Sequence, residues 1–384
     1  MVHLGILLNS SRMPRKSIAI ASLLKPVNDT RSYEKMARSL AATTAYSITL
    51  IGAKPSPLKE QDCPENIEFL PLPAFKRLGL KRFLMPLIVL KYLIKLKPEL
   101  VVVNTPELLV VTIANQIIFG GKIVYDLQEN YLRNLVFQNN YPPILKHILG
   151  GLVRLKELLF SPFIHHFILA ERGYEKELDF IGNRFTIVEN KAIPDEQFHR
   201  KKLNNINVKF LFTGNISENS GVLTALRFYS KIRKAIPGSS LTIIGHCPSS
   251  SFLKKLQNET EGDIELIVSS TPIDHSKITK QITQCDFGIV SYNINPSNEN
   301  CMPTKVFEYL TYGLPIISQT GTVWTDYALK HNTCIPLNFE HLNVDEVVGH
   351  LKEFLNSNEP KDIPEVKWGS EEKKLISLID KLLA

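Results

Sequence analysis

The chain has 384 residues, about two to three times the length of a typical domain, so the sequence predicts two domains. Hydrophobic residues make up 44% and charged residues 22%, an ordinary globular composition that excludes a chain disordered throughout. The formal net charge of +7 suits a partner that carries phosphate, such as a nucleotide, a nucleic acid or an anionic membrane.

Short apolar runs alternate with longer amphipathic segments in the first half of the chain. The predicted strands are Val2–Leu8, Ser47–Ile51, Leu100–Val103, Ile123–Tyr125, Phe163–Leu169 and Phe185–Val188. The predicted helices are Ser32–Ala42, Leu80–Lys97, Glu107–Phe119, Pro143–Phe160 and Tyr174–Ile181. Near-continuous apolar strands that alternate with helices predict a parallel sheet covered on both faces.

A polar stretch, Asn204–Asn207, follows the basic run His199–Lys202 and predicts a junction, after which the same rhythm restarts. The predicted strands of the second half are Lys209–Thr213, Ser240–Ile244, Ile264–Val268, Phe287–Val290 and Pro315–Ser318, and the clearest helices are Gly221–Ala235 and Pro303–Tyr312. Two successive α/β units predict two Rossmann-like domains whose parallel sheets face each other across a cleft. Ligands of such sheets bind at the carboxyl ends of the strands.

The cysteines and the chain start bear on the compartment. The five cysteines are irregularly spaced without a CxxC pair, which argues against a structural zinc site. Their odd number, and an apolar start without a basic leader or cleavage site, predict reduced thiols in a cytoplasm. No run reaches the roughly 18 apolar residues of a membrane span.

The most informative stretch covers residues 302–317. Pro303 suits the first turn of a helix, because it has no N–H to leave unsatisfied. The N–H groups of Thr304 and Lys305 would then point out of the helix start and could hold a diphosphate, to which Lys305 adds a cation. Glu308, one turn further, could accept hydrogen bonds from ribose hydroxyls. An ordinary helix with a Pro start and a Gly stop would explain the ends but not the Lys and Glu placed together.

This stretch resembles the donor-binding helix of GT-B glycosyltransferases of the glycogen-synthase-like family (family four), whose members often read Pro-x-Lys-x-x-Glu-Tyr-x-x-x-Gly-x-Pro-x-Ile. Other segments resemble the same family in the expected order along the chain: Asn28–Leu40, Val124–Tyr131, Val188–Lys191, Phe210–Asn215 and Leu241–Gly245. The resemblance therefore touches most of the chain.

The resemblance implies an acceptor-binding domain over residues 1–200 and a nucleotide-sugar-binding domain over residues 201–366. Residues 367–384 would form a helix that crosses back to the first domain. The implied activity is that of a hexosyl- or other glycosyltransferase that uses a UDP- or GDP-linked donor and a glycan or lipid-linked acceptor, with retention of configuration, in surface polysaccharide or glycolipid biosynthesis. Neither a cofactor nor a metal ion is implied.

Carried over onto this sequence, the resemblance assigns roles to ten residues. Gly214, Asn215, Thr304 and Lys305 would bind the diphosphate, Glu308 the ribose, and Glu299 and Asn300 the donor sugar, while Arg31 and Gln128 would face the acceptor side. Glu129, Asn300 and Lys305 form the candidate catalytic set, although Glu129 is equally well read as an exposed acid at a helix start. Asp274 is expected to cap a helix, with a contact to the nucleotide base from Asp274–His275 as the alternative.

Three departures from the family pattern leave other functions open. Asn300 stands where relatives carry the first of two glutamates, and Gln128 stands where they often have His. The turn after Gly214 lacks the Arg or Lys and the second Lys that clamp the diphosphate in relatives. These departures motivate the alternative of a non-catalytic GT-B protein that binds a nucleotide sugar or a partner. A UDP-sugar epimerase is a third reading, but it would need acidic and His residues around the cleft that the sequence does not assemble.

Two segments bear on a membrane partner. Phe75–Leu84 mixes basic with large apolar residues and predicts peripheral contact with the inner, cytoplasmic leaflet, where each nearby cation contributes about 1 kcal/mol. Pro142–Phe160 has a similar composition, but we expect it to cover the first sheet. A nucleic-acid partner is not expected, because aromatic residues do not interleave with basic ones along a platform.

Overall fold

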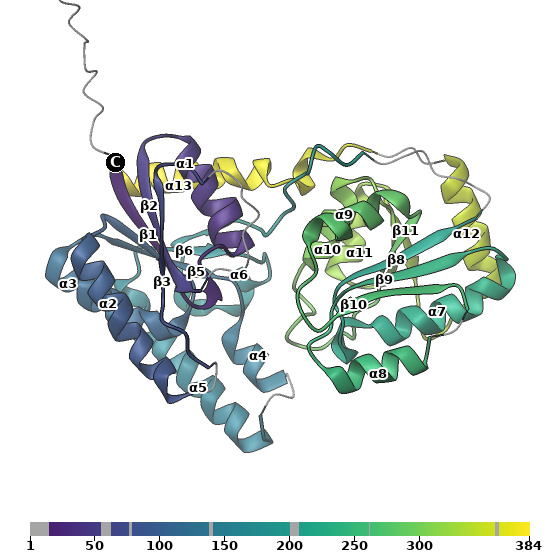
Figure 1. Cartoon of the computed structure of the whole chain (residues 1–384), viewed down its shortest axis with the longest axis horizontal. Coiled ribbons are helices and arrows are strands. Elements are labelled where there is room, and N and C mark those ends of the chain that lie inside the picture. Colours follow the sequence, from purple (N-terminus) through teal and green to yellow (C-terminus); the bar gives the residue numbers. More distant parts are fainter. Residues whose placement is uncertain are drawn as a thin grey trace, which may run out of the picture.

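The computed structural model describes residues 15–54, 63–76, 79–137, 141–199, 207–260, 262–357 and 361–384. Figure 1 shows two α/β domains side by side, each with helices packed around a central sheet. The fold predicted from the sequence, two Rossmann-like domains with parallel sheets, is confirmed. The expected strand Val2–Leu8 and most of the expected junction at Asn204–Asn207 lie outside the described residues.

The first sheet has seven strands in the order β3-β2-β1-β4-β5-β6-β7, and all the pairs are parallel. The strands are β1 Lys16–Pro26, β2 Tyr46–Ala53, β3 Ile67–Pro71, β4 Leu100–Val103, β5 Lys122–Leu127, β6 His166–Leu169 and β7 Phe185–Ile187. The strand order reverses at β1 and β4. Ligands of open α/β sheets bind beyond the carboxyl ends of the strands at such a point.

Helices cover both faces of the first sheet. On one face, α2 (Met85–Leu96) and α3 (Leu109–Phe119) pack their buried apolar side chains against the sheet. On the other face lie η1 (Thr30–Ala37), α1 (Arg38–Ala42) and the C-terminal α13 (Gly369–Leu383). The remaining helical segments are η2 Leu80–Leu84, η3 Pro106–Leu108, α4 Tyr131–Phe137, α5 Pro143–Phe160, η4 Ser161–Phe163, α6 Tyr174–Glu177 and η5 Asp179–Ile181.

The second sheet has six parallel strands in the order β10-β9-β8-β11-β12-β13. They are β8 Lys209–Asn215, β9 Ser240–His246, β10 Ile264–Ser269, β11 Phe287–Val290, β12 Ile316–Gln319 and β13 Cys334–Leu337. One face is covered by α7 Val222–Ala235, α8 Ser250–Asn258 and α12 Val344–Ser357, and the other by α9 His275–Gln284, α10 Thr304–Thr311 and α11 Val323–Lys330. Two short helices, η6 Glu218–Ser220 and η7 Pro364–Val366, complete the set.

The chain ends on the first domain. After η7 it leaves the second domain, and α13 packs Leu375 and Ile379 into the core beneath the first sheet, as Figure 1 shows in yellow. The indole N–H of Trp368 donates to Ser39 Oγ at 2.9 Å, and Lys191 pairs with Glu371 at 2.7 Å. These contacts tie the C-terminal segment to the first domain.

Three elements differ from the sequence-based prediction. The first described strand, β1, was not predicted, because its run of Ala, Ser and Lys residues is less apolar than Val2–Leu8. The predicted helix at Ser32–Ala42 begins two residues earlier as a π-helix, η1. The predicted helix Tyr174–Ile181 is wrong as one element, since Leu178 leaves the helical region with φ −122° and ψ 80° and divides it into α6 and η5.

No helix among the described residues has both the length and the apolar character that would let it cross a membrane.

Candidate functional site

The start of α10 is the centre of the candidate site. Pro303 has φ −60° and ψ 129° and forms the N-cap, so the helix begins at Thr304 and not, as predicted, at Pro303. Thr304 and Lys305 are therefore its first two residues, whose N–H groups have no partner within a helix. Because the helix dipole places partial positive charge at this end, the start of α10 favours an anion.

Lys305 is a buried cation without a hydrogen-bond partner. Its side chain is 3% exposed, and no described residue accepts a hydrogen bond from Nζ. Nζ lies 3.9 Å from the ring centre of Phe212 and 4.8 Å from that of Tyr292, so aromatic faces provide its immediate surroundings. Burial lowers the pKa of Lys305 to about 7, and the charge of Glu308 opposes this shift. A bound phosphate would supply the acceptor that the protein itself does not provide.

The turn after β8 lies against Lys305. Gly214 has φ +104°, a conformation that side-chain-bearing residues rarely adopt. A Cβ built on Gly214 would lie 3.9 Å from Lys305 Nζ, which places the ammonium directly beside the turn. Asn215 follows on the exposed surface. The structure thus brings the turn at Gly214 and Asn215 to the start of α10 at Thr304 and Lys305, two pairs of predicted diphosphate contacts that are distant from each other in the sequence.

Glu308 lies on α10 and pairs with a histidine from α9. Its Oε1 is 3.3 Å from His275 Nε2, and 24% of the Glu308 side chain is exposed. The hydrogen bond that His275 donates to Glu308 raises the pKa of His275, although burial acts in the opposite direction. Asp274 accepts a hydrogen bond from the N–H of Ser276 and is the N-cap of α9, which confirms the predicted cap. Glu308 therefore keeps an accessible carboxylate next to an exposed histidine.

Lys35 of η1 reaches toward Glu308 from the first domain. Its Nζ donates to Asn190 Oδ1 at 2.6 Å, and the side chain is 5% exposed. Burial and then the nearby charge of Arg31 lower the pKa of Lys35 to about 7, while Glu308 acts against them. Sequence reasoning did not assign Lys35 to the site. One available signal was its place in the segment that resembles the first helix of the family.

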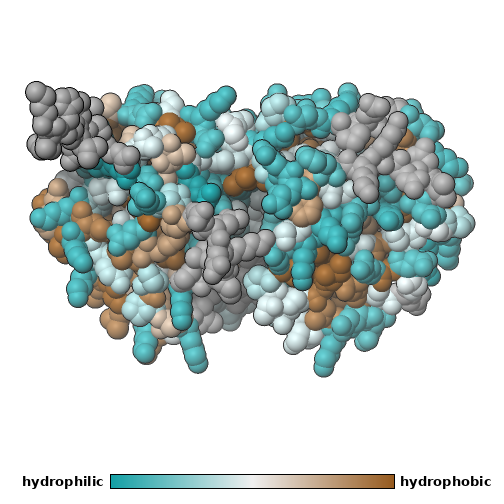
Figure 2. Space-filling model, turned by 45° about the horizontal axis from the view of Figure 1, so that its top comes forward, coloured by the Kyte–Doolittle hydropathy of each residue, from teal (hydrophilic) through white to brown (hydrophobic). Residues whose placement is uncertain are grey.

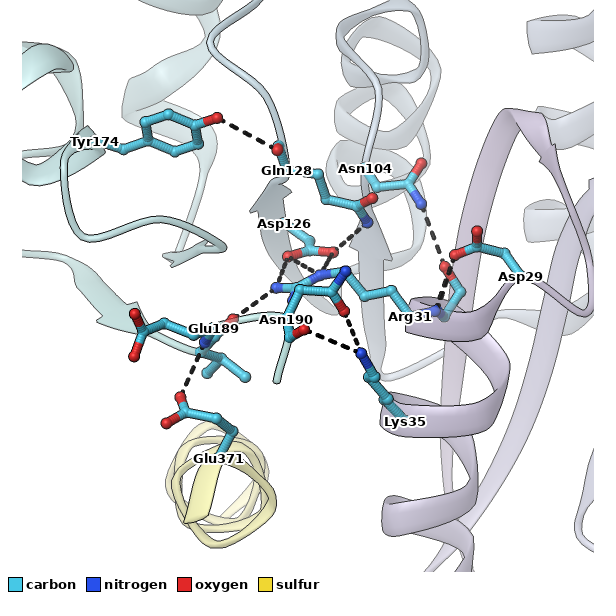
Figure 3. Close-up of polar contacts among 12 residues, drawn as sticks. Asp29, Arg31, Lys35, Asn104, Asp126, Gln128, Tyr174, Glu189, Asn190 and Glu371 are labelled. Carbon is cyan, nitrogen blue, oxygen red and sulfur yellow. Dashed lines mark hydrogen bonds and ion pairs between the residues drawn. The ribbon is translucent and has the colours of Figure 1, made fainter. Parts of the chain in front are cut away.

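Arg31 and Gln128, predicted to face the acceptor, meet through a third residue, Asp126 (Figure 3). Arg31 Nη2 lies 2.7 Å from Asp126 Oδ1, and both side chains are buried. Gln128 Nε2 donates to Asp126 Oδ2 at 2.5 Å, and its Oε1 accepts from Lys25. The charge of Arg31 is thus already balanced within the first domain, and sequence reasoning missed the aspartate that balances it.

Glu299 and Asn300 bridge the two domains. Arg133 of α4 contacts Glu299 at 3.3 Å and donates to the carbonyl of Pro296 at 2.8 Å. Asn300 Nδ2 donates to Glu177 Oε1 at 2.9 Å. These two predicted donor-sugar residues therefore lie at the junction between the domains, on the loop that leads to α10.

A second carboxylate of the first domain reaches the same loop. The N–H of Met302 donates to Glu171 Oε2 at 2.7 Å. Burial raises the pKa of Glu171 to about 8, and this hydrogen bond opposes the shift. Together with the bridges from Arg133 and Asn300, this contact shows that the start of α10 faces the first domain and not bulk solvent. Glu171 was not predicted, since no local pattern marks it.

Among the described residues, Glu129 has no hydrogen bond or ion pair with the residues at the start of α10 or on the loop that leads to it. It is exposed, two residues before α4, and accepts a hydrogen bond from Asn134 Nδ2 at 3.0 Å. This placement fits the reading of an exposed acid near a helix start, and its role as a base stays a prediction. Among the residues that the structure describes, no group of three or more His, Cys, Asp or Glu side chains could hold a metal ion.

We compared the sequence and the fold of the chain with those of known proteins. No protein-family model matches the sequence, and no curated protein sequence matches it either. Solved structures do match over nearly the whole chain. A glycosyltransferase from Rickettsia africae superposes with a TM-score of 0.67 at 10% identity, covering 97% of this chain and 99% of that one.

Two further structures extend the comparison. The Anabaena protein HepE, solved in complex with UDP, gives a TM-score of 0.60 at 10% identity over 96% of this chain and 99% of its own. A Listeria monocytogenes protein assigned as a UDP-N-acetylglucosamine 2-epimerase gives a TM-score of 0.58 at 13% identity, covering 96% of each chain. At these identities the likeness shows the fold. The chain has the GT-B fold predicted from the sequence.

Proposed function

We propose that this protein is a glycosyltransferase that moves a sugar, such as a hexose, from a UDP- or GDP-linked donor to a glycan or lipid-linked acceptor. The observation that carries the proposal is the buried, unpartnered ammonium of Lys305 beside the Gly214 turn at the start of α10. A fixed cation and oriented N–H groups suit a diphosphate leaving group, on which negative charge grows in the transition state. The same group of residues lies at the junction of a GT-B fold.

The remaining roles are those that the family resemblance implies, and the placement of the side chains supports them. Thr304, Lys305, Gly214 and Asn215 would hold the diphosphate, and the accessible carboxylate of Glu308 would bind the ribose. Glu299 and Asn300 would meet the donor sugar from the interdomain loop, since they lie where the two domains touch. Arg31 would act on the acceptor side through its network with Asp126 and Gln128. We further propose retention of the anomeric configuration and a place in surface polysaccharide or glycolipid synthesis on the cytoplasmic face of the membrane, as the family resemblance implies.

One observation favours a second function, a non-catalytic protein that binds a nucleotide sugar. The turn from Gly214 to Gly221 holds no Lys or Arg, and Arg31 of the opposite domain is already paired with Asp126. The leaving diphosphate would then rely on Lys305 and backbone N–H groups. A site with so few cations could bind a donor without completing the transfer.

A screen of UDP- and GDP-sugars separates these functions. We expect at least one nucleotide sugar to raise the melting temperature, followed by its hydrolysis or transfer when lipid extract supplies the acceptor. Stabilisation without turnover would favour the binding protein, and conversion of a UDP-sugar into its epimer would favour an epimerase. Lys305→Ala and Glu308→Ala should both weaken donor binding, whereas the exposed Lys330→Ala should not. Unchanged affinity in both site variants would show that the site is assigned wrongly.

A further inference from the structure

Helix α5 presents its apolar side to the outside of the protein. Over its eighteen residues, the buried positions are Gly150 and Glu157. An apolar stripe follows the helical repeat on the opposite side, with the exposed residues Ile144, Ile148, Leu152, Leu155 and Leu159. Helix α5 reaches the first sheet at Glu157, whose Oε1 accepts a hydrogen bond from the Tyr125 hydroxyl of β5 at 3.1 Å, but its apolar stripe does not cover that sheet. Gly150 instead packs against Leu132 and Val136 of α4.

Neighbouring helices continue this apolar exposure. In η2, which leads into α2, Leu80 is 85% exposed and Phe83 is 77% exposed, and at the end of α3 Ile117 is 72% exposed. Helix α2 contacts α3, and η3, which leads into α3, contacts both α2 and α5. We call the exposed side of η2, α2, α3 and α5 the α2–α5 surface. Figure 1 shows α2, α3 and α5 together on one side of the first domain, and Figure 2 shows apolar residues among polar ones on both domains.

This exposure is a property of one side of one domain. Among the described residues of the second domain, the exposed large hydrophobic side chains are Ile294, Val323 and Leu329, fewer than on the helices of the first domain. Single apolar side chains on a surface are ordinary, but a continuous layer across several helices is not, and it marks a surface that contacts something else.

The charges on the α2–α5 surface are complementary to an anion. Over η2, α2, α3 and α5 the sequence has no acidic residue except Glu157, which is buried. Lys81, Lys91 and Lys95 are exposed beside the apolar side chains of η2 and α2. A long lysine side chain can lay its stem along an apolar layer while its ammonium reaches a phosphate. A protein partner would need no such uniform charge, whereas the headgroups of an anionic bilayer match it.

We propose that the α2–α5 surface docks on an anionic lipid bilayer. The leucine, isoleucine and phenylalanine side chains enter the headgroup region, and the lysines that flank them pair with lipid phosphates. The contact extends the membrane segment predicted at Phe75–Leu84, of which residues 77 and 78 lie outside the described residues, to α5. It is independent of sugar transfer, because it concerns a different surface from the start of α10.

Flotation of the full-length chain with vesicles tests the apolar contact. Wild type should bind vesicles of equal parts phosphatidylcholine and phosphatidylglycerol more tightly than vesicles of phosphatidylcholine alone. The triple variant Ile148→Gln, Leu152→Gln, Leu155→Gln should bind about tenfold more weakly. A matched variant, Ile294→Gln, Val323→Gln, Leu329→Gln, should bind as wild type does. Because all six side chains are exposed, both variants should fold, which their melting curves verify.

The lysines give an independent arm. Neutralising Lys81, Lys91 and Lys95 to Gln should weaken binding to the phosphatidylglycerol vesicles by about fivefold per lysine. Lys231→Gln and Lys234→Gln on α7 serve as the control and should leave it unchanged. The proposal is overturned if wild type does not bind the anionic vesicles or if the α5 variant binds as wild type does. It is also overturned if wild type is a dimer that the α5 changes dissociate, because the surface would then be an interface between copies.

Discussion

The buried ammonium of Lys305 lowers the stability of the fold and is also the group that we propose binds the diphosphate. An ammonium that is buried without a hydrogen bond is unfavourable for the fold, because it has lost its water without gaining an acceptor. Natural proteins keep such groups where function needs them, so stability and activity should respond to their removal in opposite directions. No such conflict is expected for a lysine with a purely structural role.

Lys305→Met tests this opposition, since methionine nearly preserves the shape of the side chain and removes its charge. We expect a higher melting temperature than wild type. We also expect donor affinity to fall by about 2 kcal/mol, roughly thirtyfold, for the lost charge-assisted hydrogen bonds. Thermal unfolding and titration calorimetry measure the two effects. A variant that is less stable and binds the same nucleotide sugar equally well would contradict the assignment.

The same burial predicts how stability depends on pH. The pKa values of Lys305 and Lys35 are both lowered to about 7 in the folded protein, whereas an unfolded chain holds lysine near its ordinary value. Above pH 7 the unfolded state therefore binds more protons than the folded state, and the free energy of unfolding rises with pH. These lysines should make the protein more stable at pH 9 than at pH 7, and Lys305→Met should reduce the rise. An equal rise in the variant, measured by urea unfolding, would show that Lys305 does not titrate in this range.

Sequence reasoning named the residues of the candidate site that a local motif or the family resemblance marks, and it missed those that only tertiary contacts bring in. Lys305 and Glu308 are one helical turn apart, so a local pattern reveals them. Three residues join the candidate site through partners that are distant in the chain: Lys35 lies near Glu308, Asp126 pairs with Arg31, and Glu171 accepts from Met302. No spacing rule predicts such contacts. The contact of Asn300 with Glu177 was hidden for the same reason.

At the scale of elements, the two glycines that frame the turn from Gly214 to Gly221 meet different structural requirements. Gly214 needs a positive φ beside Lys305, whereas Gly221 at the start of α7 also needs space. A Cβ on Gly221 would lie 1.5 Å from the carbonyl oxygen of Ser291, with φ at +77°. The turn can therefore connect to α7 in this way with glycine at that position.

Gly221→Ala should destabilise the protein by about 2 kcal/mol or more, because the backbone of Ser291 must move. Gly151→Ala is the matched control: a Cβ there meets nothing within 4 Å, and alanine in the middle of α5 should add up to about 1 kcal/mol. Both values follow from urea unfolding. If the two substitutions had similar effects, the close approach of Gly221 to Ser291 would be in doubt.

Hydrophobic periodicity in the sequence can predict where a helix begins and ends. Pro143–Phe160 was predicted with the bounds that α5 has, since Pro143 and the long amphipathic pattern define it. Periodicity alone did not tell which way the apolar side faces, because the same stripe fits a core or a membrane. The strand β1 was not predicted for a related reason, since pairing with β2 and β4 selects it and an apolar count does not.

At the scale of the whole molecule, α13 connects the end of the chain to the first domain. Leu375 and Ile379 are fully buried in the core that also holds Met36 and Leu40 of η1 and α1. Because η1 carries Arg31 and Lys35, α13 supports the helix that holds Arg31 against Asp126 and places Lys35 near Glu308 of the second domain. The N-terminal contribution to the site therefore depends on the last residues of the chain.

Ile379→Ala should lower the free energy of unfolding by about 2–5 kcal/mol, as the removal of a buried isoleucine side chain commonly does. Leu329→Ala is the control, since that side chain is exposed on α11 and its loss should cost little. Urea unfolding gives both values. A cost for Ile379→Ala as small as that of the control would mean that α13 is not part of the first core.

The most direct test of the account is the pKa of Lys305 itself, measured by NMR on protein with ¹³C-labelled lysines and assigned with Lys305→Met. In the free protein the pKa should lie at about 7. Addition of UDP or GDP should raise it toward the ordinary value of lysine, because a diphosphate beside Nζ favours the charged form. If neither nucleotide moves the pKa, Lys305 does not contact the donor, and the proposed site at the start of α10 is wrong.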